Sequence, residues 1–178
     1  MRRNELEIAG INVPVLATVC AGPLPQPGNW AQRLERLGLD VITTGAPVDD
    51  PVAVATAAVA VPFRPVMAWP GDASVELLVE AGARIVATDD PVPQGAYAFT
   101  VDEAMVVPIS ADAPAENAND VAREVLAAAR GGQASAIWVA APDLSTVPED
   151  IVEAKLTALC EGTRMARMWL SKQQSDPD

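Results

Sequence analysis

The sequence predicts an α/β fold in which short strands alternate with helices along a single domain. Half of the 178 residues are hydrophobic, which is enough apolar material for one core. The short β-branched runs are apolar throughout, a pattern typical of strands buried on both faces in a parallel sheet. Longer segments between them carry apolar residues three and four apart, as helices do. We therefore expect one α/β domain over residues 1–172, followed by a disordered polar tail at 173–178.

Seven runs are candidate strands and five segments are candidate helices. The stretch 51–63 is apolar but too short to span a bilayer, and its Ala and Val content predicts a buried helix. No helix is expected directly after residue 90, where a loop rich in proline and glycine follows. The strands are expected at residues 14–20, 40–44, 65–69, 84–88, 96–100, 105–110 and 136–140. The helices are expected at residues 29–37, 51–61, 73–81, 112–130 and 149–170.

Two architectures satisfy this order of elements, because parallel strands need right-handed crossovers. One is a compact or truncated (β/α) barrel of the TIM type, and the other is an open, doubly wound parallel sheet. A full barrel has about 250 residues, so a barrel here would have lost at least one helix. The two architectures differ in strand order, and the order of strands in a sheet cannot be read from the alternation of strands and helices along the chain.

Charge and cysteine content limit the classes of partner. The chain has 24 acidic and 12 basic residues and a formal net charge of -12. Such a surface repels phosphate backbones and anionic lipids, so we expect neither a nucleic-acid nor a membrane partner. Two cysteines are too few for a disulfide-stapled scaffold, and no apolar run follows the two N-terminal arginines. We expect a cytoplasmic protein with reduced thiols.

Candidate site residues lie where predicted strands end, since functional groups gather at that edge in both architectures. Carboxylates meeting there could hold Mg²⁺ or Mn²⁺ through oxygen ligands. The sequence contains no histidine, which excludes His-based triads and imidazole metal sites, and it has no glycine-rich phosphate loop. We therefore expect no cofactor and no zinc. The positions are Cys20, Thr43, Thr44, Trp69, Asp89, Asp90, Ser110, Asp112 and Asp143, with Asp49, Asp50 and Asp72 in the adjoining loops.

Most of these aspartates have a structural interpretation as well. Asp50, Asp72 and Asp112 precede helical runs and are expected to cap them. Asp89 and Asp90 have no helix after them, so they are either ligand-binding groups or a solvated turn. Cys20 is either a thiol facing a pocket or a small buried residue, and Trp69 either lines a pocket or covers the end of the sheet.

Residues 136–167 resemble the end of the barrel of cobalamin-independent methionine synthase, in the superfamily shared with uroporphyrinogen decarboxylase. In that family the last strand runs into a Pro-Asp-Cys-Gly-Leu motif, then a turn with proline and a long helix with Lys-Leu near its start. The early loop 22–25 is similar to that family's opening segment. This resemblance favours the truncated barrel. The matching residues are Pro142, Asp143, Pro148, Lys155, Leu156 and Arg164.

The resemblance does not extend to the residues that bind zinc in that family. Leu144 stands where the family has a zinc-binding cysteine, and the family's histidine ligand has no counterpart in a chain without histidine. Zinc-dependent methyl transfer is therefore not expected. Asp143 is the residue that the resemblance leaves as a contact for a substrate or as a shaper of its loop.

Two functions follow from the sequence. The first is a methionine synthase-like barrel without zinc ligands, acting as a non-catalytic structural or regulatory subunit of a homo- or hetero-oligomer. Exposed Leu24, Trp30 and Trp69 would then lie in the interface. The second is a small-molecule enzyme or binding protein that uses strand-end groups, possibly with a divalent cation. Its candidate ligand-binding residues are Asp143, Asp89, Asp90, Cys20 and Trp69.

Overall fold

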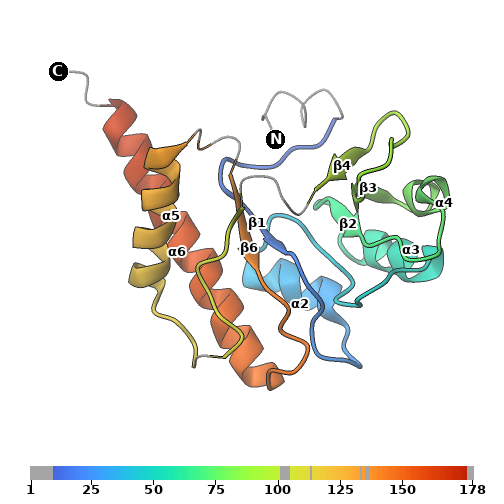
Figure 1. The fold of residues 1–178 in the computed structure, drawn as a ribbon, viewed down its shortest axis with the longest axis horizontal. Helices are drawn as coiled ribbons and strands as arrows, with labels where there is room; N and C mark the ends of the chain where they lie inside the picture. The colour runs from blue at the N-terminus through green and yellow to red at the C-terminus, as the bar shows by residue number, and fades with distance from the viewer. Residues whose placement is uncertain (1–9, 101–104, 113, 133, 135–136, 176–178) are drawn as a thin grey trace.

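The computed structural model describes residues 10–100, 105–112, 114–132, 134 and 137–175, and it has the expected α/β composition (Figure 1). Within those residues, no helix is both long enough and apolar enough to cross a membrane. The strands are β1 (Ala17–Cys20), β2 (Val66–Ala68), β3 (Ala83–Ala87), β4 (Tyr97–Phe99), β5 (Met105–Val106) and β6 (Trp138–Ala141). The helices are α2 (Trp30–Leu37), α3 (Pro51–Ala60), α4 (Val75–Glu80), α5 (Ala118–Gly131) and α6 (Glu149–Ser175).

The strands form two small parallel sheets. One sheet has the order β1-β6-β5 and the other the order β2-β3-β4. The predicted strand 40–44 is reduced to a link between them: the amide of Val41 donates to the carbonyl of Thr18 in β1, and Ile42 forms a parallel bridge with Val66 in β2. The spatial order is therefore β4-β3-β2, then the link, then β1-β6-β5.

The expected closed barrel is not confirmed. Both described sheets are open, and no pairing joins β4 to β5 among the described residues, so the open parallel alternative fits. The array is nevertheless curled. Phe99 of β4 and Trp138 of β6 pack edge to face with ring centroids 5.2 Å apart, although five strand steps of about 4.8 Å would separate them by roughly 24 Å in a flat sheet.

The core has an inner and an outer part because alternate strand residues face opposite ways. In β1, Val19 belongs to the inner cluster and Cys20 to the outer one. The inner cluster is formed by strand and loop residues, with Ile11 and Val13 from the preceding segment, and none of its described members lies in a helix. The outer cluster joins the strands to the helices. The helices thus pack on the outer side of the curled strands.

Helices α5 and α6 lie side by side on one flank of the molecule, and α3 and α4 lie on the opposite flank (Figure 1). A Cβ added at Gly162 of α6 would lie 2.6 Å from Cβ of Val121 in α5, so glycine allows the close crossing. Lys155 of α6 is fully buried, and its Nζ lies 3.1 Å from both carboxylate oxygens of Glu116.

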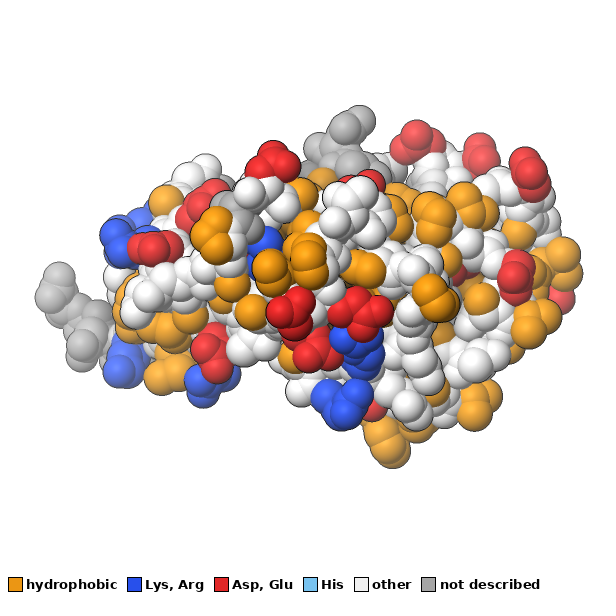
Figure 2. Space-filling view, turned by 90° about the horizontal axis from the view of Figure 1, so that it is seen from below, with side chains coloured by type: hydrophobic (Ala, Val, Ile, Leu, Met, Phe, Trp, Pro, Cys, Tyr) orange, Lys and Arg blue, Asp and Glu red, His pale blue; other side chains and the backbone are white. Residues whose placement is uncertain are grey.

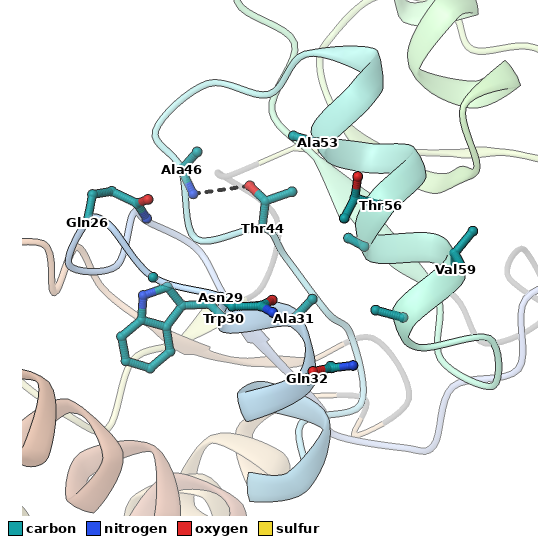
Figure 3. Close-up of a pocket in the computed structure, with 13 residues that line it drawn as sticks. Gln26, Asn29, Trp30, Ala31, Gln32, Thr44, Ala46, Ala53, Thr56 and Val59 are labelled. Carbon is teal, nitrogen blue, oxygen red and sulfur yellow. Dashed lines mark hydrogen bonds between the residues drawn. The ribbon is translucent and has the colours of Figure 1, made fainter.

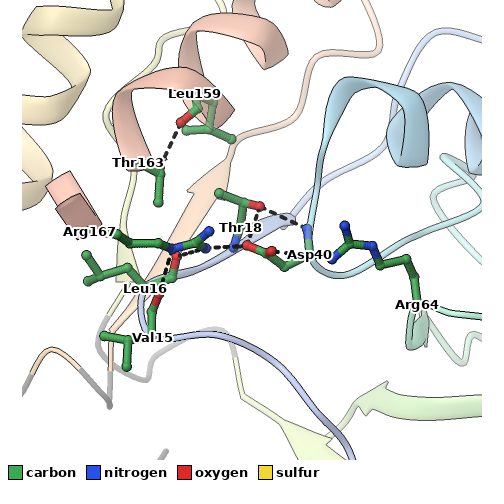
Figure 4. Close-up of polar contacts among 8 residues, drawn as sticks. All are labelled: Val15, Leu16, Thr18, Asp40, Arg64, Leu159, Thr163 and Arg167. Atoms are coloured by element: carbon green, nitrogen blue, oxygen red, sulfur yellow. Dashed lines mark hydrogen bonds and ion pairs between the residues drawn. The ribbon is translucent and has the colours of Figure 1, made fainter. Parts of the chain in front are cut away.

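A second buried polar cluster ties α6 to the start of β1 (Figure 4). The Asp40 carboxylate accepts hydrogen bonds from the backbone amide and the hydroxyl of Thr18, and it forms an ion pair with Arg167. Arg167 also donates to the carbonyls of Val15 and Leu16, at 2.8 and 2.9 Å. Charged groups buried at this depth need such partners, and here they join α6, β1 and the link strand.

The helix starts differ from those expected at two of three aspartates. Asp50 caps α3 as expected, accepting from the amide of Ala53. At α4 the cap is Ser74 and not Asp72, and α5 begins only at residue 118 with Asn117 as its cap. Serine and asparagine satisfy the free amides equally well, so several polar residues near a start compete for the position.

The end of α6 extends past the expected residue 170 to Ser175. The helix therefore includes the first three residues of the segment 173–178 that we expected to be a disordered tail. Residues 176–178 lie outside the described residues.

Candidate functional site

The strand-end carboxylates do not form a metal site. Asp89 and Asp90 follow β3, whereas Asp143 follows β6 in the other sheet, and all three are exposed. The described part of the chain has no group of three or more Cys, Asp or Glu side chains placed to hold a metal ion. The backbone amide of Asp90 donates to the Thr88 hydroxyl, which is the geometry of a local turn.

Asp143 shapes its own loop. Its Oδ1 accepts hydrogen bonds from the amide and the hydroxyl of Ser145, at 2.9 and 2.6 Å, and these bonds lower the pKa of the carboxyl group. A Cβ on Gly22 would lie 2.6 Å from the amide nitrogen of Asp143, and Leu144 donates to the carbonyl of Pro23. The loop after β1 and the loop after β6 therefore contact one another.

Asp49, in the loop that leads into α3, is a buried carboxylate without a cationic partner among its described contacts. One oxygen accepts from the Thr44 hydroxyl and the other from the Trp69 amide. Burial raises the pKa of Asp49, and these two hydrogen bonds partly oppose the shift. Because the Asp49 amide also donates to the Trp69 carbonyl at 2.8 Å, the residue fixes the loop before α3 to the end of β2.

The two cysteines are not positioned as nucleophiles. Cys20 is fully buried in the outer core, where desolvation and the nearby Cys160 raise the pKa of its thiol. Desolvation and the charge of Asp40 raise the pKa of Cys160 to about 12. Thiols with raised pKa values are poor nucleophiles at neutral pH. Cys20 therefore occupies the place of a small buried apolar residue.

The apolar residues expected in an interface are mostly internal. Leu24 and Trp30 are completely buried, which corrects the expectation that they are exposed. The Trp30 indole donates to the carbonyl of Pro25, and the Arg33 guanidinium lies 3.8 Å above its ring. Trp69 is half-buried against the inner core at the end of β2.

A groove of about 720 Å³ lies between α2 and α3 (Figure 3). Amides from Gln26, Asn29 and Gln32 border one side of it. The α3 side presents small residues and Thr56, and Thr44 lies at the base. No ionisable side chain lines the groove, so its chemistry is that of uncharged hydrogen bonding and apolar contact.

The outer face of α3 is exposed and apolar. Val52 and Val59 of α3 are 75% and 81% exposed, and Phe63, in the turn after the helix, is 92% exposed. Thr56, which lies between the two valines on this face, donates its hydroxyl proton to the Val52 carbonyl. Only Val54 and Ala57 of the helix are buried. The expectation that 51–63 is a buried helix is therefore wrong for its outer face. A helix without charges is normally covered on all sides.

Acidic residues lie beside this apolar face, at the start of α3 and on the neighbouring α4. Between residues 38 and 84 the sequence has six acidic residues and two basic ones, Arg64 and Arg84, which line a small hollow with Phe63. Nη1 of Arg64 lies 3.6 Å from the Asp40 carboxylate. Figure 2 shows apolar and acidic side chains without Lys or Arg on the part of its view occupied by α3 and α4. We call the exposed acidic residues beside this face the acidic rim. They are Asp50, Asp72, Glu76 and Glu80, with Leu77 between them on α4.

We define the α3 surface as the exposed α3 residues Val52, Thr56 and Val59, the exposed Phe63 in the turn after the helix, and the adjoining groove. The signal for it was present in the sequence as a run of 13 residues without any charge. Such a run predicts burial, but it does not say whether the chain itself supplies the cover.

No protein-family model matches this sequence, and no curated protein is similar to it. The function is therefore inferred from the residues of the chain itself.

Proposed function

We propose that this chain is a non-catalytic subunit, structural or regulatory, that binds another protein through the α3 surface. The exposed apolar face of α3 is the observation that supports this function. Val52 and Val59 on α3, and Phe63 in the turn that follows it, are all at least 75% exposed, and exposed apolar side chains of this kind mark interaction sites in folded proteins.

The scaffold we propose is a shortened, incompletely closed (β/α) barrel of the methionine synthase-like kind. The last strand β6 lies beside the first strand β1, the helices pack on the outer side, and Phe99 meets Trp138 across the inner core. Each of these features is typical of a barrel. The contact between the Asp143 loop and the Gly22 loop also agrees with the resemblance.

The hydrogen bonds and burial of the strand-end polar groups agree with a subunit that has no catalytic role. Asp143 bonds to its own loop, Asp49 holds Trp69, and Cys20 is buried with a raised pKa. Each group is occupied in maintaining the fold. The alternative, a small-molecule enzyme or binding protein that uses strand-end carboxylates, would have the groove between α2 and α3 as a pocket, but no carboxylate lines it.

A photo-reactive amino acid at position 59, introduced into the chain in its native cells, tests the proposal. We expect it to crosslink a specific second protein that then forms a stoichiometric complex with the purified chain in native mass spectrometry. The same substitution at Met168, an exposed apolar residue on α6, is the control and should not crosslink that protein. A purified monomer with stoichiometric Mg²⁺ or Mn²⁺ and no crosslink at position 59 would overturn the proposal in favour of the enzyme.

A further inference from the structure

We infer that the α3 surface binds an amphipathic helix of the partner whose apolar face is flanked by lysine or arginine residues. This inference rests on the proposed function and specifies the chemistry of its partner. The geometry, the rim charge and the charge of the whole chain support it independently.

The geometry suits a helix. The exposed residues 52, 56 and 59 follow the spacing of one face of α3, so they present a ridge along the groove, and the exposed Phe63 lies in the turn after the helix. The groove wall on α3 consists largely of Ala53, Ala57 and Ala60, and such small side chains allow a second helix to approach closely. Because α3 has 10 residues, it matches a partner helix of about three turns.

The rim selects the charge of the partner. Asp72, Glu76 and Glu80 are exposed, and Arg64 already lies beside Asp40. Lysine or arginine residues on the edge of a partner helix nearest α4 would meet these acidic groups, whereas Arg64 and Arg84 lie with Phe63 beyond the end of α3. Complementary charge of this kind accelerates association and excludes partners of the same sign.

A second copy of this chain is a poorer occupant. A symmetric dimer would bring the same patch of both molecules together, and so place two acidic rims opposite one another in chains that each have a net charge of -12. An anionic lipid surface is disfavoured for the same reason. A cationic protein segment satisfies both the apolar row and the rim.

Three labelled synthetic peptides of about four helical turns provide the test, with fluorescence anisotropy as the measurement on the full chain. The first has a Leu/Ala face flanked by Lys, the second has Glu in place of each Lys, and the third has the composition of the first in a scrambled, non-amphipathic order. We expect the first to bind at least about tenfold more tightly than either control. We also expect its affinity to fall when salt is raised from about 0.05 M to about 0.3 M.

Variants of the chain locate the binding. Val59→Asp should weaken binding of the Lys peptide by about tenfold, whereas Met168→Asp on α6 should leave it unchanged. The pair Glu76→Gln and Glu80→Gln should reduce the salt dependence, whereas Glu124→Gln, an exposed residue of α5, should not. Circular dichroism of each variant verifies the fold.

Equal binding of the Lys and Glu peptides, or an unchanged affinity in Val59→Asp, would overturn the inference. If position 59 still crosslinks a second protein in cells, the subunit function stands and only the cationic helix is wrong. If position 59 crosslinks only to another copy of the chain, the surface is a self-association interface and both proposals are wrong.

Discussion

Helices α6 and α3 are held to the rest of the protein by different kinds of contact. α6 carries charged residues, and two of them, Lys155 and Arg167, reach buried or partly buried partners in Glu116 and Asp40. α3 contains no charged residue and buries only Val54 and Ala57. One helix is held by specific polar contacts on several sides, and the other by apolar contact on one side.

This contrast shows which helix finds all its contacts within the chain and which does not. Each buried charge of α6 has a partner within the described residues, so folding alone satisfies that helix. The outer face of α3 gains little from folding, because Val52 and Val59 stay largely exposed. Apolar side chains that contribute little to the fold and cost solubility are expected to serve an interface.

The largest expected effect lies at the contact of α6 with β1. Asp40→Ala leaves Arg167 and the Thr18 amide without their common acceptor, so we expect a loss of about 3–5 kcal/mol in the free energy of unfolding. Urea unfolding followed by circular dichroism measures it. Asp40→Asn, which keeps one acceptor oxygen, should lose less. Equal stability of Asp40→Ala and the wild type would show that α6 is not held by this cluster.

An intermediate effect, dependent on pH, is expected at Asp49. Its pKa in the folded protein is raised above the ordinary value of 3.8, so the folded state binds this proton more tightly than the unfolded chain does. Its contribution to stability is full below pH 3.8 and is lost as the pH rises through the raised pKa.

Asp49→Asn removes this titration while its amide can still bond to Thr44 and Trp69. We therefore expect the stability of the variant relative to the wild type to increase from acidic to neutral pH, measured by urea unfolding at a series of pH values. Asp143→Asn, at a carboxyl group whose pKa is lowered, should show the opposite sign. A relative stability of Asp49→Asn that is independent of pH would contradict the prediction.

The smallest effect is expected on the outer face of α3. Val59→Asp should change the free energy of unfolding by no more than about 0.5 kcal/mol, because the side chain is already exposed. Val54→Ala on the inner face of the same helix should cost about 2 kcal/mol. Thermal unfolding of the two variants compares the faces directly. A large loss in Val59→Asp would mean that the row contributes to the fold and would weaken the contrast with α6.

Local sequence signals predicted the elements better than their exact ends. The run before Cys20 and the capping of α3 by Asp50 follow from β-branched residues and from an aspartate next to Pro51, and both are present. The start of α5 was missed because Asp112 and Asn117 are both good caps. Choosing between them depends on packing against α6, which local patterns do not encode.

The alternation of strands and helices, the parallel strand pairing and the acidic charge could be predicted from residue type and spacing alone. The strand order, the curl that brings Phe99 to Trp138 and the uncovered side of α3 became known only from the three-dimensional structure. Those features depend on contacts between residues far apart in the chain. The same is true of the ion-pair partners of Asp40 and Lys155, because the sequence position of a charged residue does not indicate which distant residue it will pair with.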